Sequence, residues 1–504
     1  MEDIGDQIWE RAHRLFQCVS VAARPLYVEE LADILAFNFE GESTPTFWAK
    51  RRSKDPVRTV LSTCSSLLAV VNEDGFQIVQ FVHFSVQEYL TSERLAKAKD
   101  SISRFHVATI PGHTIIAQAC LGILLHLDKN ITKDSLKNFP LAEYAAKHWV
   151  DHAQIKNVSS NVQDGIKRLF DPRKSHLSVW VWIYDPERPQ HRSERSENPT
   201  AARATPLHYS AVCRLHDLAT FLIVEHLQDV DARGFDKGET PLHVALRYRH
   251  MDIARLLITH RADTDARDDE NDTPLHRASR KGDVEVVEFL LRHEADKDAQ
   301  DKFGQSPLML ALRMRHVEIV RCLLKCGADM EARDMGGWTP LIHASKMGNV
   351  EMARLLLKQG ADVKVQYECR YTPLHYASSH GQLAVAQLLL EYDADVKARN
   401  AHNQTPLHEA KGKEVAQFLI EHGADVDALD AQNRTPLHQA LEDGITEVAR
   451  VLLEHGADAN CRDAENATPL DLVASGPGFY NYMFDITTQL LLEHGAWSGG
   501  SQES

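Results

Sequence analysis

The residues of this chain that could do chemistry are its 27 histidines and eight cysteines. Imidazole and thiolate groups bind zinc or act as bases and nucleophiles when several of them converge. Cys322 and Cys326 lie four residues apart and share a helix face, but no nearby Cys or His pair completes a tetrahedral site. We therefore expect core packing there, with no metal and no cofactor. The cysteines also lack a disulfide framework, which favours free thiols.

Most of the histidines recur at two positions of a repeated pattern, so a structural role is favoured over catalysis. One group follows Thr-Pro-Leu and the other precedes Gly: His208, His243, His276, His375, His408 and His438, then His422, His455 and His494. A histidine that returns once per repeat is expected to hydrogen-bond neighbouring backbone. The sequence contains no H-E-x-x-H, G-x-S-x-G or G-x-x-x-x-G-K-[ST] motif. These observations predict a protein that is not an enzyme and does not hydrolyse nucleotides.

The histidines are positioned by a repeat that begins with Thr-Pro-Leu-His or a close variant. It starts at Thr205, Thr240, Thr273, Ser306, Thr339, Thr372, Thr405, Thr435 and Thr468. The interval is 33 residues, except for one of 35 and one of 30. A capping Thr, a Pro in the first helical turn and a Gly at the end of an apolar run predict two helices and a loop per unit. The pattern resembles the ankyrin repeat, which implies an α-solenoid of about nine repeats over residues 201–498.

Several units depart from this pattern. Arg261, Glu294 and Asp393 stand where a left-handed Gly is expected, and the unit from Thr405 is three residues short. We expect the shortening to tighten the turn between the two helices of that unit. Alanines two residues after the histidine position, such as Ala344, are small enough to let neighbouring helices approach. The first two units are expected to be partly covered by the domain that precedes them.

The first 200 residues predict three helices followed by a β-hairpin around Asn72–Gly75, with Ser85 capping the next helix. That order is typical of a winged helix, here over residues 1–95. A helical segment over 96–184 and a linker over 185–200 would follow it. The runs RPLYVEELADIL and FVHFSVQEYL resemble the winged helix of fungal NACHT-type signalling NTPases, and ISRFHVATIPGHT resembles the helical segment that comes next in them. Those proteins commonly carry C-terminal ankyrin arrays.

The resemblance does not extend to the nucleotide-binding module, because the phosphate loop is missing from the sequence. NTPase activity is therefore not carried over, and the chain is either a naturally truncated relative or an incomplete gene model. The basic loop Lys50–Lys54, with Arg58, could contact DNA or mark nuclear import, or could simply be a solvated loop between helices. We favour the solvated loop, because one small basic cluster on a neutral domain is weak evidence.

Composition and charge narrow the classes of ligand. The 504 residues are 43% hydrophobic and carry a net charge of −16, of which −15 falls in residues 201–504. Such an acidic array repels phosphate backbones, so nucleic acid is not an expected ligand. The apolar run Ile115–Leu127 is too short to span a bilayer and predicts a buried helix rather than a membrane contact. With no signal peptide visible at the N-terminus, the expected location is the cytoplasm, with the nucleus as the alternative.

The leading hypothesis is a non-enzymatic scaffold or adaptor that binds other proteins through the concave face and loop tips of the array, with no small-molecule ligand. The candidate partner-binding residues in the central tips are Phe303, Met335, Trp338, Tyr367, Arg370 and Tyr371. For Trp338 and Tyr371, packing against the adjacent loop is an equal alternative, whereas Phe303 and Tyr367 favour binding. The other hypotheses are a regulatory C-terminal fragment of a NACHT-type NTPase and, with less support, a DNA-binding winged-helix regulator.

Overall fold

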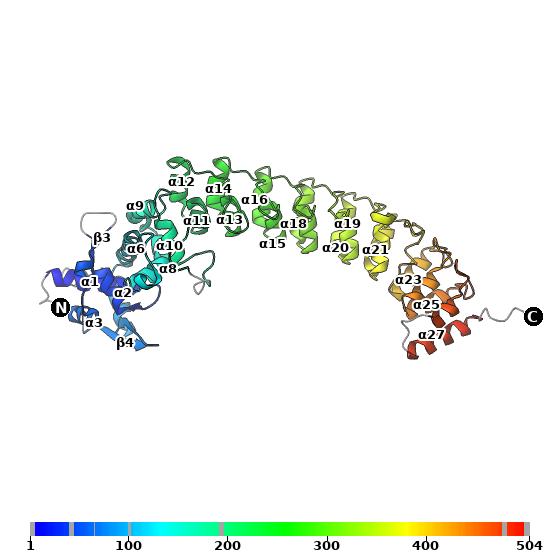
Figure 1. Ribbon diagram of the computed structural model, residues 1–504, viewed down its shortest axis with the longest axis horizontal. Coiled ribbons are helices and arrows are strands. Elements are labelled where there is room, and N and C mark those ends of the chain that lie inside the picture. The colour runs from blue at the N-terminus through cyan, green and yellow to red at the C-terminus, as the bar shows by residue number, and fades with distance from the viewer. Residues whose placement is uncertain are drawn as a thin grey trace, which may run out of the picture. The chain divides into compact units, whose positions relative to one another are not determined.

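The structure is a computed structural model that describes residues 6–39, 45–64, 66–98, 102–190, 196–475 and 481–497. The chain divides into two compact units, Met1–Ala262 and Asp263–Ser504. The first unit combines helices with small sheets, and the second is a succession of helix pairs (Figure 1). The prediction of a mainly α chain is confirmed.

The first unit begins with three helices and a three-stranded antiparallel sheet in the order β1–β5–β4. These elements are α1 (Asp6–Val21), β1 (Leu26–Tyr27), α2 (Val28–Leu35), α3 (Pro56–Cys64), β4 (Leu68–Glu73) and β5 (Phe76–Phe81). The hairpin closes through Asp74 and Gly75, whose φ angles are 50° and 84°. Two consecutive positive φ angles match the twist of a two-residue hairpin turn. The predicted hairpin is therefore confirmed, and helices followed by a hairpin form the predicted winged-helix order.

Smaller elements complete this part of the unit: β2 (Phe37–Asn38), β3 (Thr46–Phe47), a 3-10 turn (Ala49–Arg51), α4 (Phe84–Thr91), α5 (Glu93–Ala96) and a 3-10 turn (Ser103–Phe105). The predicted cap of α4 is wrong. The helix begins at Phe84, and the Nδ1 atom of His83 accepts the Ser85 amide at 3.2 Å. An imidazole can replace the usual Ser or Asp here because its acceptor reaches the same unpaired N–H.

A long apolar helix, α6 (Thr109–His126), forms the core of the next part, together with α7 (Lys133–Leu136), α8 (Leu141–Ala153), α9 (Ser159–Leu169) and α10 (His176–Ile183). It packs against α1, α8 and α9. A Cβ at Gly122 would lie 2.5 Å from the Phe37 ring, so only glycine allows this close approach. By length and composition Ser103–His126 could span a membrane, which corrects the expectation of a run too short to do so. An 18-residue window of this stretch is nevertheless 56% buried in the unit, as the predicted buried helix would be.

A chain of buried and partly buried hydrogen bonds joins the segment after α1 to α8 and α6. The Ala23 amide donates to the Tyr144 hydroxyl at 3.0 Å, and that oxygen lies 2.9 Å from His152 Nε2. His152 Nδ1 in turn lies 2.8 Å from His113 Nδ1. Burial lowers the pKa of His152 to about 4, so the imidazole is neutral at physiological pH.

Two helix pairs of the repeat belong to the first unit: α11 (Pro206–Val212) with α12 (His216–Val224), and α13 (Pro241–Arg247) with α14 (Met251–Thr259). The Gln163 amide donates to Asp217 at 2.8 Å, and the Trp180 ring meets Tyr209 edge-on at a centroid distance of 6.0 Å. The Arg247 guanidinium lies 2.9 Å from Glu187, inside the predicted linker. The preceding segment therefore covers part of the first two repeats, as expected from the sequence.

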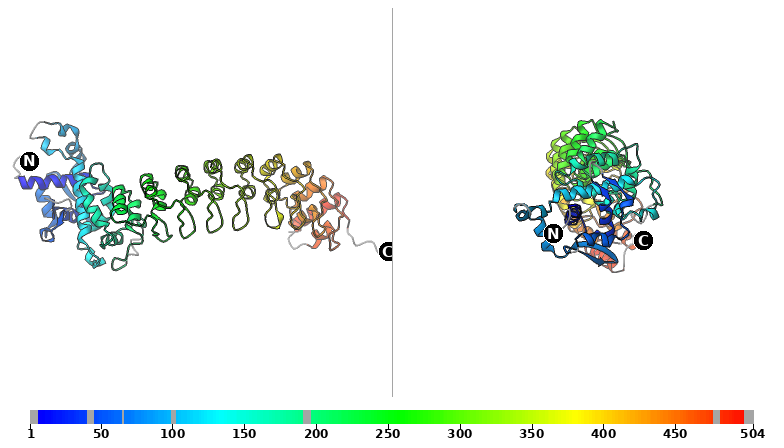
Figure 2. Two further views of the ribbon diagram at one scale, coloured as in Figure 1. Left: turned by 90° about the horizontal axis from the view of Figure 1, so that it is seen from above. Right: turned by 90° about the vertical axis from the view of Figure 1, so that its left-hand side faces the viewer.

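The second unit stacks first helices on first helices and second helices on second helices (Figure 2). Its helices are α15 (Pro274–Lys281), α16 (Val284–Arg292), α17 (Pro307–Arg313), α18 (Val317–Lys325), α19 (Pro340–Lys346), α20 (Val350–Lys358), α21 (Pro373–Ser379), α22 (Leu383–Glu391), α23 (Lys413–Glu421), α24 (Pro436–Glu442), α25 (Thr446–Glu454), α26 (Pro469–Ser475) and α27 (Asn481–Glu493), with a 3-10 turn at Glu368–Arg370. First helices begin at the proline, as predicted. Arg261, Glu294 and Asp393 take positive φ angles of 66°, 61° and 63°, as expected for residues that replace the left-handed glycine.

Several of the repeat histidines tie their unit to the next. The Thr372 amide donates to His375 Nδ1 at 3.2 Å, so that nitrogen carries no proton. The Nε2–H of the same ring then donates to the Gln404 carbonyl oxygen at 3.1 Å, in the loop of the following unit. His276 makes the same bond to the Gln305 carbonyl at 3.0 Å. The predicted role of these histidines in bonding neighbouring backbone is confirmed.

The shortened unit from Thr405 differs from its prediction. Residues 406–409 form a turn instead of a first helix, and the next helix starts at Lys413. The expected tightened turn between two helices is therefore wrong, because the missing three residues remove most of the first helix itself. The Lys411 amide donates instead to the Ser378 carbonyl of the preceding unit at 3.1 Å.

Candidate protein-binding surface

Hydrogen bonds within each loop tip and between neighbouring tips hold the tips of the second unit in a regular row. Asp301 Oδ1 accepts the amides of Phe303 and Gln305 at 2.8 and 2.9 Å, which closes the loop on itself. The Met335 amide then donates to the Phe303 carbonyl at 2.8 Å and joins neighbouring tips. At Gly304, with φ of 73°, a Cβ would lie 2.7 Å from the Met335 nitrogen. The tips are therefore ordered platforms for side chains.

Two of the candidate residues present large apolar side chains to solvent at these tips. Phe303 is 55% exposed and Met335 is 79% exposed. The Lys302 ammonium lies 5.0 Å from the centre of the Phe303 ring. An aromatic ring supplies a large contact area, and a methionine side chain adapts its shape to the surface of a partner. Both are suited to contact another protein.

Trp338 and Tyr367 do not stand alone but belong to a cluster of aromatic rings. The Trp338 ring lies 5.7 Å from Tyr367 and 5.4 Å from Tyr376, centroid to centroid. Tyr371 lies 5.6 Å from Tyr376. All four side chains are partly buried, so each keeps part of its surface accessible to solvent. We call Trp338, Tyr367, Tyr371 and Tyr376 the aromatic cluster.

Polar groups fix the orientation of this cluster. His343 Nε2 lies 2.9 Å from Asp334 Oδ2, and its ring packs 5.1 Å from Trp338. The Lys346 ammonium lies 4.2 Å from the centre of the Trp338 ring, a cation–π contact. Burial lowers the pKa of His343 and outweighs the hydrogen bond to Asp334, which raises it. The imidazole is therefore a neutral support for the tryptophan.

The last two candidates lie at the edge of the cluster. The Tyr371 hydroxyl donates to Glu409 Oε1 at 2.7 Å. Burial is the main cause that raises the pKa of Tyr371, and this hydrogen bond raises it further. Arg370 is exposed, with a φ angle of 60°, and its Nε atom lies 3.4 Å from Gln366 Oε1. The structure thus groups Tyr367 with Trp338 and Tyr371, apart from Phe303 and Met335.

Sequence reasoning missed Tyr376, Lys346 and Glu409, although a signal existed. Tyr376 and Glu409 directly follow the histidine position of their units. Lys346 lies three residues after His343, which holds the position equivalent to theirs in α19. Exposed positions of the first helices adjoin the loop tips. Candidate binding residues should therefore be sought at both sets of positions.

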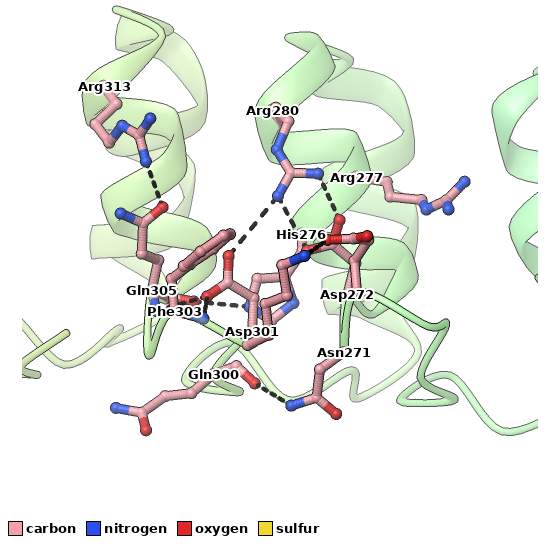
Figure 3. Close-up of polar contacts among 12 residues, drawn as sticks. Asn271, Asp272, His276, Arg277, Arg280, Gln300, Asp301, Phe303, Gln305 and Arg313 are labelled. Atoms are coloured by element: carbon pink, nitrogen blue, oxygen red, sulfur yellow. Dashed lines mark hydrogen bonds and ion pairs between the residues drawn. The ribbon is translucent and has the colours of Figure 1, made fainter. Parts of the chain in front are cut away.

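A row of charged side chains lies beside the tips of the third and fourth units. Figure 3 shows Arg280 of α15 between Asp272 and Asp301, at 3.0 and 3.8 Å, and Arg313 of α17 on Gln305. Arg277 contacts Asp268 through its Nε atom at 2.8 Å. The buried carboxylates thus neutralise Arg277 and Arg280, whereas Arg313 has a neutral amide as its hydrogen-bond partner among the described residues.

The histidine, cysteine and carboxylate side chains in the described parts of the chain bear on the metal-site and thiol chemistry considered for the sequence. No group of three or more His, Cys, Asp or Glu side chains there could hold a metal ion. Seven described cysteines are free, and Cys326 is exposed while Cys322 is partly exposed, so the core packing expected for this pair is wrong. Burial raises the pKa of Cys18 and Cys213 to about 12. Such thiols stay protonated and are poor nucleophiles.

The basic loop of the winged helix is partly engaged inside its own unit. The Arg52 Nε atom lies 2.7 Å from Asp33, whose side chain is buried, and the Arg51 guanidinium lies 3.9 Å from the centre of the Trp48 ring. Lys50 and Lys54 remain at the surface of this loop. Two of the five charges that suggested a DNA contact therefore serve local packing.

Comparison with known proteins agrees with this fold. The family described as ankyrin repeats (3 copies) matches seven overlapping stretches that together run from residue 207 to residue 496. The chain belongs to the ankyrin-repeat family. Residues 4–103 match the winged helix domain of GPI inositol-deacylase. An ankyrin solenoid preceded by a winged-helix domain is thus the architecture of this protein, and ankyrin repeats are typical protein–protein interaction modules.

Among curated proteins, the azaphilone pigments biosynthesis cluster protein L of Monascus ruber is 28% identical over 266 residues. The match covers 50% of this chain and 55% of the relative, so the chain spans about half the length of that protein. Among solved structures, the ankyrin repeat domain of Bcl-3, a member of the IkappaB protein family, is 30% identical with a TM-score of 0.41. The human ASB11 ankyrin repeat domain is 27% identical with a TM-score of 0.40. These two cover 44% and 45% of this chain and are themselves covered in full.

Proposed function

We propose that this protein is a non-enzymatic scaffold or adaptor that binds another protein on the loop tips and first helices of its fourth to sixth repeats. The observation that carries the proposal is the half-buried aromatic cluster beside the exposed Phe303 and Met335. Large aromatic side chains that are held in place but still accessible are the usual energetic anchors of interfaces. The proposed location is the cytoplasm, with the nucleus second.

The test is the affinity of the full chain for a partner recovered by cross-linking in cells. Replacing Phe303, Trp338 and Tyr367 together by Ala should weaken binding by at least about 2 kcal/mol, as for interface hot spots. Leu492→Ala, at a side chain that is 54% exposed on α27, is the control for loss of an apolar surface group. Unchanged affinity of the triple variant would remove the binding surface from the central repeats.

Packing within the cluster requires a second variant. Trp338 and Tyr367 contact each other and Tyr376, so their loss could loosen two units as well as the interface. A double variant, Phe303→Ala with Met335→Ala, changes only side chains that are mostly exposed. It should weaken binding by about 1 kcal/mol with an unchanged circular dichroism spectrum.

A second candidate is a contact between the winged helix and a nucleotide-binding module supplied in trans. Phe76, Val82, Phe84 and Tyr89 are each more than half exposed around the hairpin and α4. Exposed large apolar side chains on a small domain favour an interaction surface. Binding of a purified nucleotide-binding module, lost on Phe84→Asp, would support this role, and its absence would leave the scaffold function alone.

A further inference from the structure

The first helices of the second unit carry a divided charge pattern on their exposed positions. The basic residues at these positions in the third to fifth units are Arg277, Arg280, Lys281, Arg313 and Lys346. The corresponding positions of the seventh and eighth units hold Glu409, Glu442 and Asp443. The positive end runs against the net charge of −15 over residues 201–504. We call this surface, with the adjoining tips, the first-helix face.

Two of the basic groups are not neutralised by acidic side chains. The Arg313 guanidinium donates to the neutral Gln305 amide oxygen at 2.5 Å, and the Lys346 ammonium lies against the Trp338 ring. Neither forms an ion pair within the described residues. They occupy the same position of α17 and α19, two first helices that pack against each other. Both also lower the pKa of His343, which the Asp334 carboxylate raises. A carboxylate placed there would meet two cations that have no acidic partner among the described residues, while the nearby Asp334 carboxylate is engaged by His343 at 2.9 Å.

We infer that the first-helix face binds an extended segment of a partner protein that carries carboxylates next to a large apolar side chain. The carboxylates lie at Arg313 and Lys346, and the apolar side chain packs on Trp338, Tyr367 and Tyr376. The inference rests on the proposed function, since it names the chemistry of the partner for the same surface. Charge complementarity directs the approach and register of such a segment, and the aromatic rings anchor it.

A nucleic acid fits this face less well than an acidic peptide. A phosphate backbone carries a charge at every nucleotide, so a strand that follows the face would leave the cations and meet Glu409 and the exposed Asp443. A peptide can place its carboxylates over the third to fifth units and uncharged residues beyond them. The surrounding excess of acidic groups opposes every long polyanion.

The test uses the full chain and fluorescein-labelled peptides in a fluorescence anisotropy titration. One peptide has a run of Glu before a Phe-Leu-Phe anchor, a second has Lys in place of Glu, and a third has Ala in place of the anchor. The Glu peptide should bind at least about tenfold more tightly than either of the others, with affinity falling as salt rises. Equal binding of the Lys peptide, equal binding of oligothymidine, or no binding of the Glu peptide would overturn the inference.

Matched variants locate the site. Arg313→Gln with Lys346→Gln should weaken the Glu peptide about tenfold, whereas Lys325→Gln with Lys358→Gln, at exposed residues of the second helices, should leave it within about twofold. Arg313→Glu with Lys346→Glu should reverse the preference between the Glu and Lys peptides, which a mere loss of folding would not do. An equal effect of the control pair would overturn the placement.

The two proposals fail in distinguishable ways. If a partner recovered from cells loses affinity on substitution of Phe303, Trp338 and Tyr367 but keeps it in Arg313→Gln with Lys346→Gln, the partner is not acidic and only the inference fails. If substitution of the aromatic residues has no effect, the proposed function at this surface fails first.

Discussion

At the scale of single residues, the repeat histidines show how a polar ring is accommodated inside an apolar stack. His375 is fully buried, but its two ring nitrogens have complementary partners, one accepting from the Thr372 amide and one donating to the Gln404 carbonyl. Because both ring nitrogens make hydrogen bonds, the neutral ring avoids the free-energy cost of a buried polar atom without a partner. Protonation would destroy the acceptor nitrogen, and burial accordingly lowers the pKa of His375 to about 4.

We predict that this repeat histidine makes folding sensitive to acid. The ordinary pKa of 6.5 applies to the unfolded chain, so the unfolded state binds the proton first and stability falls as pH drops from 6.5 toward 4. Between about pH 7 and about pH 5, His375 alone should account for a loss of about 2 kcal/mol. Urea unfolding midpoints at the two pH values measure it. His375→Gln, which does not titrate, should show a smaller acid loss, and an identical loss would contradict the assignment.

A second residue-scale prediction concerns the close contact between neighbouring helices. Ala344 is 3% exposed in α19, at the position where the repeat places a small residue. Ala344→Asp buries an unpaired carboxylate and should lower the free energy of unfolding by roughly 3–5 kcal/mol. Ala401→Asp, at an exposed tip, is the matched control and should change it by less than about 0.5 kcal/mol. Coincident denaturation midpoints for the two variants would show that the helix register is wrong.

At the scale of elements, the repeat period predicted the helix starts, and the turn at Asp74 and Gly75 predicted the hairpin. These features depend on local chemistry that a sequence displays directly. The packing of Trp338 on Tyr376 could not be predicted this way, because two half-exposed rings meet only through the loop conformation and side-chain rotamers of adjacent units. The loss of the first helix after Thr405 was missed for a related reason, since a deletion can shorten a turn or an element and the period does not say which.

The unit from Thr405 should be the most easily opened part of the array. Its first segment keeps the bonds from His408 to Thr405 and from Ala410 to Leu407, but it lacks the helix that each neighbouring unit has. Backbone amides of residues 407–411 should therefore exchange with deuterium at least about tenfold faster than those of residues 374–378 in α21. The matched segment in α24 should resemble α21. Equal protection in all three segments would mean that stacking alone, without the helix, stabilises this unit.

At the scale of the whole molecule, the boundary between compact units does not fall where the repeat begins. The first unit ends at Ala262 and includes the first two helix pairs of the repeat. The buried Trp180 meets Tyr209, Lys167 lies 4.5 Å from the centre of the Phe221 ring, and Glu187 binds Arg247. These two repeats thus pack against the preceding domain, and part of their surface is covered. The fourth to sixth repeats lie outside that unit, and we place the partner-binding surface there.

This arrangement predicts how the chain can be cut. A fragment of residues 1–262 should unfold in one transition, whereas a fragment of residues 1–200 exposes Trp180 and removes the partners of Gln163 and Glu187. The shorter fragment should therefore melt at least about 5 °C lower, since loss of a few kcal/mol shifts the midpoint of a domain of this size by several degrees. Thermal unfolding followed by near-ultraviolet circular dichroism reports on the buried tryptophans directly. Equal melting temperatures would show that the first two repeats contribute nothing to that domain and belong to the array alone.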